Sequence, residues 1–240
     1  TPLTLSYAIL HKDGSVDWFV DQRKIIPGLS ESLGNEIAIQ PIDDFGKRLS
    51  ELGAAGAEIR TDPSTAAAYV FEKLSGARIV MQQDPCALPK AIKNETEIAG
   101  MRNAHERDGL ALTRFLHWLS KSVPKGEVTE ITASDQLHEF RAESGALRDL
   151  SFPTISSTGP NGAVVHYHAT DKTNRALRLG ELYLVDSGAQ YLDGTTDVTR
   201  TIVIGEPTAE MTDRFTRVLK GHIAIATARF PKGTTGGQLD

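Results

Sequence analysis

The pattern of hydrophobic and polar positions predicts a mixed α/β chain. Residues 3–85 carry short β-rich runs that alternate with segments of helical spacing, an order typical of α/β layers. The first two runs, 3–10 and 16–21, flank the turn sequence KDGS at 12–15, so we expect a β-hairpin there. The run EIAIQPI at 36–42 predicts a third strand.

A long amphipathic helix is predicted after a break at residues 84–95, which contains two prolines. From 98 to 119, residues at steps of three and four form one helix face. The middle of this face is polar, with His105 and Asp108. A satisfied histidine at a helix seam or domain boundary is the favoured interpretation, and a metal-binding pair is the alternative.

Two further helices follow from the same spacing. One is expected to start at Thr129 and to end at Gly145, because a glycine often follows the last helical turn. The other is expected over residues 208–229. Its apolar positions predict a buried face made of Met211, Phe215, Val218, His222 and Ile225.

Residues 181–204 are the most informative part of the chain. Two apolar runs flank a turn with an Asp-Gly pair at 193–194, which is a hairpin signal. Asp186 ends the first run and Asp197 begins the second. The Asp-Gly pair is not centred between these two acids, so we expect a longer loop or a bulge that brings Asp186 alongside Asp197.

Paired aspartates on one hairpin can form part of a metal site. Ionised carboxylates in an apolar setting are costly unless a cation or a donor compensates them, and Asp186 follows the apolar run LYLV. Acids of this kind can hold two metal ions about 3.5 to 4 Å apart. The alternative is that Asp186, Asp193 and Asp197 are solvated turn acids. A calcium loop is disfavoured, because DGTTD lacks the required order of acids and the distal glutamate.

Two histidines stand in a strand-like run at residues 161–170. His166 and His168 are two positions apart and share a face if the strand is regular. They could bind zinc, or one could polarise a substrate carbonyl. The alternative is an exposed histidine at a strand end, which is the favoured interpretation of His168.

The composition limits which binding partners and which cellular compartment we expect for this protein. The chain has 240 residues and a formal net charge of -5, with no basic face for nucleic acid. Its apolar runs are shorter than the roughly 20 residues needed to span a bilayer, so no membrane partner is expected. One cysteine, Cys86, fits a reducing compartment, and we expect a cytoplasmic protein. Thr1 and Asp240 do not resemble natural ends, so we expect a fragment.

Three segments resemble the M24 metallopeptidases of the pita-bread fold, and within them the aminopeptidase P group of Xaa-Pro aminopeptidases. These are DPCALPKAIKNETEIAGMRNAH at 84–105, NGAVVHY at 161–167 and DSGAQYLDGTTDVTRT at 186–201. The resemblance implies that Asp186 and Asp197 bind metal and that His166 lies near the scissile bond. It gives no role to His168.

The resemblance also implies the domain organisation. Residues 1–86 would be the end of a noncatalytic α/β domain of creatinase type, and 87–240 the first half of a pita-bread catalytic domain, an α/β (α+β) fold. One histidine and two glutamates that complete the metal site in this family are expected beyond Asp240. The chain would then hold two of five ligands and be inactive alone.

The implied activity is removal of the N-terminal residue from peptides with proline in second position. Two divalent ions, most often manganese with zinc or cobalt as alternatives, would bridge the attacking hydroxide. The expected partners are X-Pro peptides and a second subunit in a homodimer. The remaining alternatives are an inactive pita-bread binding module and a prolidase-type dipeptidase.

Overall fold

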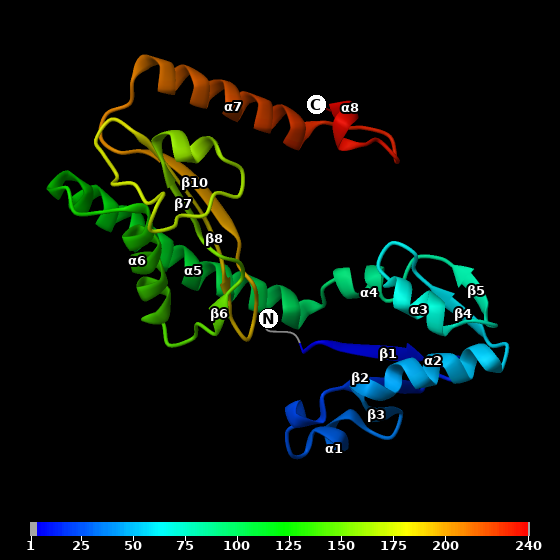
Figure 1. Ribbon diagram of the computed structural model, residues 1–240. Helices are drawn as coiled ribbons and strands as arrows, with labels where there is room; N and C mark the ends of the chain where they lie inside the picture. Colours follow the sequence, from blue (N-terminus) through cyan, green and yellow to red (C-terminus); the bar gives the residue numbers. More distant parts are fainter. Residues whose placement is uncertain (1–3, 240) are drawn as a thin grey trace. The chain divides into compact units, whose positions relative to one another are not determined.

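The computed structural model describes residues 4–239, which form two compact units that divide between Thr96 and Glu97 (Figure 1). Both units combine helices with sheets, which confirms the predicted α/β class. The predicted domain boundary after residue 86 stays a prediction. Among the described residues, no helix is long and apolar enough to cross a membrane.

The N-terminal unit contains a three-stranded sheet in the order β1-β2-β3 and a two-stranded parallel sheet of β4 and β5. Its elements are β1 (Ser6–Leu10), β2 (Val16–Val20), a 3-10 helix (Gln22–Lys24), α1 (Leu29–Leu33), β3 (Ile37–Pro41), a 3-10 helix (Ile42–Asp44), α2 (Phe45–Ala54), β4 (Glu58–Thr61), α3 (Ala68–Lys73), β5 (Arg78–Met81) and α4 (Ala87–Ala91). The predicted hairpin is confirmed, because β1 and β2 pair antiparallel. The third predicted strand is also present and runs parallel to β2.

The second unit is built on an antiparallel sheet in the order β10-β8-β7. Its elements are α5 (Glu95–Ser122), a 3-10 helix (Val123–Lys125), α6 (Glu130–Ala142), β6 (Asp149–Leu150), β7 (Ile155–Thr158), a 3-10 helix (Gly159–Ala163), β8 (Leu182–Ser187), β9 (Ala189–Gln190), β10 (Val198–Val203), α7 (Ala209–Thr227) and α8 (Gly236–Leu239). The three predicted helices are confirmed as α5, α6 and α7. Thr129 and Thr208 cap the last two with their side chains.

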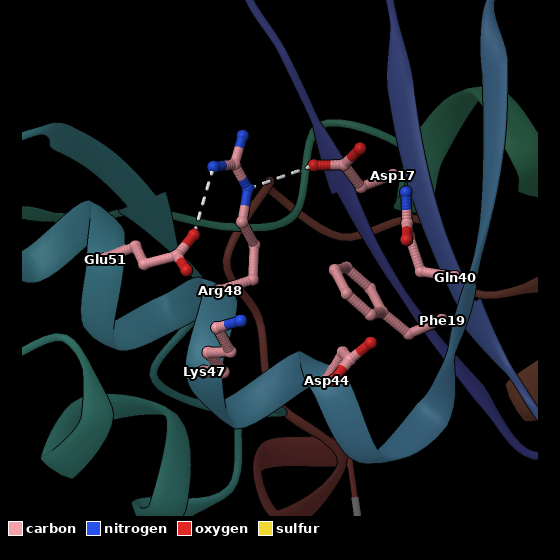
Figure 2. A pocket seen from close by; sticks show the side chains of 7 residues that line it. All are labelled: Asp17, Phe19, Gln40, Asp44, Lys47, Arg48 and Glu51. Atoms are coloured by element: carbon pink, nitrogen blue, oxygen red, sulfur yellow. Dashed lines mark hydrogen bonds and ion pairs between the residues drawn. The ribbon is translucent and has the colours of Figure 1, made fainter.

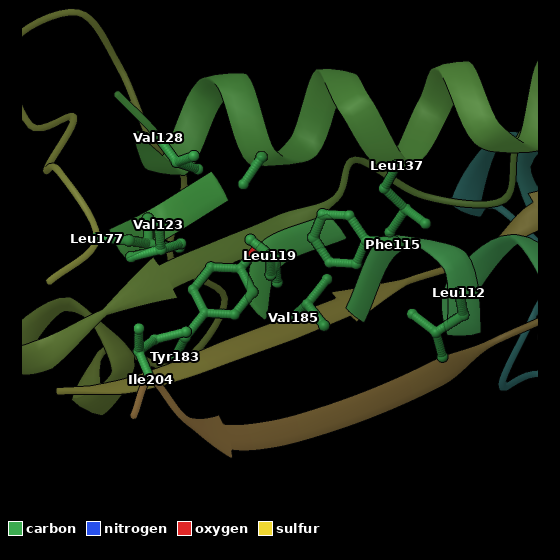
Figure 3. Close-up of a cluster of buried hydrophobic side chains, with 11 residues drawn as sticks. Leu112, Phe115, Leu119, Val123, Val128, Leu137, Leu177, Tyr183, Val185 and Ile204 are labelled. Carbon is green, nitrogen blue, oxygen red and sulfur yellow. The ribbon is translucent and has the colours of Figure 1, made fainter. Parts of the chain in front are cut away.

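The core of the second unit lies between the sheet and the helices α5 and α6 (Figure 3). Phe115 and Leu119 of α5 and Leu137 of α6 are fully buried there. Strand β8 contributes Tyr183 and Val185 to the same cluster. Because alternate residues of a strand point to opposite faces, residue 186 lies on the face of the sheet that is turned away from α5 and α6.

Helix α7 differs from its prediction in burial. Phe215, Val218 and Ile225 are 56%, 74% and 57% exposed, and α7 has no buried residue. The expectation that Met211, Phe215, Val218, His222 and Ile225 form a buried face is therefore wrong. Helical spacing predicts the helix and its apolar side, but no element in the described part of the chain covers that side.

Candidate metal site on the hairpin of strands β8 and β10

The acid-bearing hairpin keeps a single register from its sheet to its turn. Asp186 lies opposite Thr199. At the turn the Tyr191 N–H donates a hydrogen bond to the Gly194 carbonyl at 2.9 Å, which follows the same pairing. The expected longer loop or bulge is therefore wrong. The two turn residues are 192 and 193, one position before the Asp-Gly pair.

Asp197 lies diagonally across the hairpin from Asp186. The register that pairs Asp186 with Thr199 places Asp197 opposite Gly188. Alternate residues of an extended strand share a face, so both acids belong to the same face of the hairpin. Diagonal neighbours in an antiparallel pair are about 7–8 Å apart at Cα. A regular hairpin thus brings the two carboxylates together without a bulge.

The two acids differ in their surroundings. The Oδ1 atom of Asp186 is buried and accepts no hydrogen bond from the described residues, whereas Asp197 is exposed. A buried carboxylate oxygen without a donor is unfavourable unless a cation compensates it. The environment of Asp186 therefore fits a metal ligand better than a solvated turn acid.

Gly188 lets the two arms of the hairpin approach closely opposite Asp197. A Cβ atom at this position would overlap the Thr196 carbonyl oxygen and the Ser151 hydroxyl oxygen. The Ser151 hydroxyl donates a hydrogen bond to the same Thr196 carbonyl at 2.9 Å. Only glycine fits here, because any side chain would displace the arm that carries Asp197.

The histidine segment is not a strand. Residues 159–163 form a 3-10 helix that is followed by a turn, so the shared strand face predicted for His166 and His168 is wrong. His166 has φ 56°, in the left-handed region that histidine enters more readily than most residues. Both histidines are exposed, whereas Tyr167 between them is buried.

A buried glutamate anchors the loop that carries these histidines. The Glu130 carboxylate accepts hydrogen bonds from the backbone N–H groups of Thr158 and Arg175, at 2.8 and 3.0 Å. It also accepts from the Asn161 amide at 3.0 Å and from the Tyr167 hydroxyl at 2.9 Å. Burial raises the pKa of Tyr167, so its hydroxyl stays a donor. Sequence patterns gave no signal of this network.

The polar positions in the middle of α5 do not form a metal-binding pair. Asp108 is buried and accepts hydrogen bonds from Arg141 and Tyr191. His105 is exposed, and its Nδ1 lies 2.8 Å from the Met101 carbonyl oxygen. Within residues 4–239, no three His, Cys, Asp or Glu side chains lie close enough to hold a metal ion. The structure therefore brings Asp186 and Asp197 together but adds no third ligand.

The N-terminal unit holds a separate charged pocket of about 320 Å³ between α2 and the strands β2 and β3 (Figure 2). Arg48 forms ion pairs with Asp17 at 3.2 Å and with Glu51 at 3.5 Å. His11 lies 2.9 Å from the same Asp17 carboxylate. These charges compensate each other, which gives them a structural role. The pocket is lined by Asp17, Phe19, Gln40, Asp44, Lys47, Arg48 and Glu51.

The chain belongs to metallopeptidase family M24, whose model matches residues 99–240, and the creatinase/prolidase N-terminal domain model matches 1–97. Its relatives include a probable Xaa-Pro aminopeptidase P from Paracoccidioides brasiliensis strain Pb03, which is 44% identical. The alignment with this relative covers 100% of the present chain and 41% of the relative. The Xaa-Pro aminopeptidase ApepP of Drosophila melanogaster is 40% identical, and the alignment covers 100% of the present chain and 40% of ApepP.

Solved structures agree with this assignment. An X-prolyl aminopeptidase from Caenorhabditis elegans, described as a cytosolic enzyme with a di-nuclear active site, has a TM-score of 0.87 at 33% identity and covers 100% of this chain and 40% of its own. An Xaa-Pro dipeptidase from Bacillus anthracis shares the fold, with a TM-score of 0.74 at 22% identity. Its superposition covers 100% of the present chain and 66% of the dipeptidase. The chain thus spans about two fifths of the length of the curated relatives it matches.

Proposed function

We propose that this chain is part of a metal-dependent Xaa-Pro aminopeptidase, which removes the first residue from peptides with proline in second position. The observation that carries the proposal is the common hairpin face of Asp186 and Asp197, with a buried oxygen of Asp186 that accepts no hydrogen bond from the described residues. Relatives named Xaa-Pro aminopeptidase match the whole chain at 40% to 44% identity, which supports the same substrate class.

Asp186 and Asp197 would hold the metal ions in this proposal. Carboxylate oxygens are hard ligands, which suit manganese, and zinc or cobalt are the alternatives. Two ions are supported by the di-nuclear active site in the description of the C. elegans relative. When bound, divalent ions lower the pKa of water and polarise a carbonyl. The part of the protein outside this chain would supply one histidine and two glutamates.

His166 would contact the substrate. It is exposed on a loop that Glu130 anchors through Tyr167, so its ring can reach a ligand while its backbone stays fixed. The bond before proline has no N–H group, which leaves the carbonyl oxygen as the polar atom for a protein donor. We assign to His166 a hydrogen bond to this oxygen, which would stabilise negative charge during attack.

The description of one solved structure bears on the compartment of this protein. The C. elegans enzyme is described as cytosolic, and one exposed cysteine, Cys86, fits a reducing compartment. We therefore propose a cytoplasmic protein. The homodimer expected from the family resemblance stays a prediction.

The test uses the full-length protein that contains this chain, with the variants Asp186→Asn and Asp197→Asn. Each variant should lose bound metal and roughly 100-fold in turnover of X-Pro peptides, since the amide oxygen carries no charge and binds a divalent cation more weakly than a carboxylate does. Metal content is measured by mass spectrometry, and turnover with a tripeptide series. The exposed loop acid Asp171 supplies the control variant Asp171→Asn, which should retain both.

Three outcomes would contradict the proposal. Full turnover in both variants would exclude the two acids as ligands. A wild-type protein that binds no metal and hydrolyses no peptide would be an inactive binding module of the same fold. Hydrolysis of X-Pro dipeptides with no activity on longer peptides would instead identify a prolidase-type dipeptidase.

A further inference from the structure

The turn of the acid-bearing hairpin packs closely against helix α5. A Cβ atom on Gly100 would overlap the backbone carbonyl of Asp193. On the other side of the contact, a Cβ on Gly194 would come within 2.9 Å of the Ala104 side chain and 3.1 Å of the Met101 sulfur. Glycines on both partners thus let the turn approach the helix more closely than any other residue would allow.

Arg107 holds this turn from the helix side. Its guanidinium donates to both carboxylate oxygens of Asp193, with Nη1–Oδ1 3.1 Å and Nη2–Oδ2 3.0 Å. The same guanidinium lies 4.8 Å from the centre of the Tyr191 ring. Bidentate pairing combined with a cation–π contact fixes both position and orientation. The Arg107 side chain therefore contacts the turn at two residues, Asp193 and Tyr191.

Asp108, the next residue of α5, is buried and binds the hairpin through hydrogen bonds. Asp108 accepts a hydrogen bond from the Tyr191 hydroxyl at 2.9 Å and two from Arg141, at 2.7 and 3.0 Å. Arg141 also donates to the Ser187 hydroxyl at 3.1 Å. Ser187 directly follows Asp186 in the chain, so this network links the turn to the β8 arm beside the candidate ligand.

We propose that Arg107 is a positioning residue of the metal site, with the Tyr191–Asp108 hydrogen bond as its second hold on the hairpin. Neither Arg107 nor Asp108 forms a hydrogen bond or an ion pair with Asp186 or Asp197 in the described structure. They act by fixing the register of the hairpin on α5. A slip of one residue would turn every side chain of an arm to the opposite face and would separate the two carboxylates.

The chain offers a matched control on the same helix. Arg114 forms an ion pair with Glu143 at 2.6 Å, and its guanidinium lies 4.8 Å from the Phe140 ring centre. Arg114 thus loses the same two kinds of contact when it is changed to alanine. Its partners belong to the C-terminal end of α6 and to the residue after it, and not to the hairpin.

The experiment measures manganese binding to the metal-free full-length protein by calorimetry, together with Tm. Groups that orient metal ligands typically change affinity by roughly 10–100-fold when removed. We expect Arg107→Ala to raise the Kd roughly 10-fold and Arg107→Lys to raise it less, because lysine keeps the charge without the bidentate geometry. Tyr191→Phe, which removes only one hydroxyl, should also raise the Kd. Arg114→Ala should lower Tm and leave the Kd unchanged.

The positioning role rests on the proposed metal-binding role of the two aspartates, and the same titration separates the two ideas. If Asp186→Asn binds manganese as the wild type does, both the proposed site and the positioning role are wrong. If Asp186→Asn loses binding while Arg107→Ala and Arg114→Ala have equal Kd values, only the positioning role is overturned.

Discussion

Single acids in the second unit differ in how their charge is compensated. Glu130 is fully buried and accepts hydrogen bonds from two backbone N–H groups and two side chains. Asp186 has a buried oxygen that accepts no hydrogen bond from the described residues. A carboxylate with several donors is a structural anchor, whereas one without them is available to a cation. Burial alone would not distinguish these two roles.

Replacement of Glu130 by glutamine tests the anchor. In Glu130→Gln, the side-chain NH2 group would face the groups that donate hydrogen bonds to the wild-type carboxylate, and it would find no acceptor among them. A buried donor without an acceptor costs about 1–3 kcal/mol. We expect the free energy of unfolding to fall by about that amount in urea titrations. Amide hydrogen exchange at residues 164–168 should become faster, because the Tyr167 contact weakens. The exposed Glu127 provides the control, since Glu127→Gln should change neither quantity.

Helices were predictable from the spacing of residues, but the hairpin register was not. Apolar positions at steps of three and four define α5, α6 and α7 without knowledge of their neighbours. The hairpin turns at Leu192-Asp193, although Leu192 is apolar and 79% exposed. A local rule favours the Asp-Gly pair. That rule is overridden because Gly194 is needed for the close packing on α5.

The sequence predicts the residues of the candidate site but not how they are arranged. The two aspartates stand out by their place beside apolar runs, and the structure adds that they are diagonal neighbours. The segment 161–170 has the residue types of a strand but forms a 3-10 helix and a turn, because Asn161 and Tyr167 bind the buried Glu130. Long-range contacts of this kind leave no periodic signal in the sequence.

The contact between α5 and the hairpin should weaken in acid. A hydrogen bond from Arg107 lowers the pKa of Asp193 below its usual value of 3.8. A carboxylate whose pKa is lower in the folded state stabilises that state above its unfolded pKa, and this contribution is lost as pH falls through the folded pKa. The difference in unfolding free energy between wild type and Arg107→Ala should therefore be full at pH 7 and smaller at pH 3.

Denaturant titrations at the two pH values measure this difference. The pair is partly exposed, so high salt should reduce the difference at pH 7 as well. An equal difference at pH 7 and pH 3 would show that Arg107 stabilises the fold through its contact with the Tyr191 ring and not through Asp193.

Within the residues that the structure describes, the second unit combines a covered apolar cluster with an uncovered apolar helix side. In the second unit, the cluster between the sheet and helices α5 and α6 is closed, whereas the apolar side of α7 is exposed. The chain spans about two fifths of the length of its curated relatives. The stability of the second unit in the 240-residue chain should therefore depend on the closed cluster and very little on α7.

Two phenylalanines test this division in the 240-residue chain. Phe115 is 0% exposed and Phe215 is 56% exposed. Phe115→Ala should lower the free energy of unfolding by about 3–5 kcal/mol, as in other large-to-small core changes. Phe215→Ala should change it by less than about 0.5 kcal/mol, as at ordinary surface positions. A large loss from Phe215→Ala in chemical denaturation would mean that α7 is packed in solution.

The diagonal placement of the two aspartates has a consequence for how this segment can vary in length. Residues inserted at the turn, between Tyr191 and Gly194, lengthen the loop and leave both acids on the same side as long as Asp186 stays opposite Thr199. A one-residue shift of that pairing would turn Asp197 to the opposite side. Evolution and protein engineering can therefore vary the length of this turn without separating the two acids, provided that the pairing of β8 with β10 is kept.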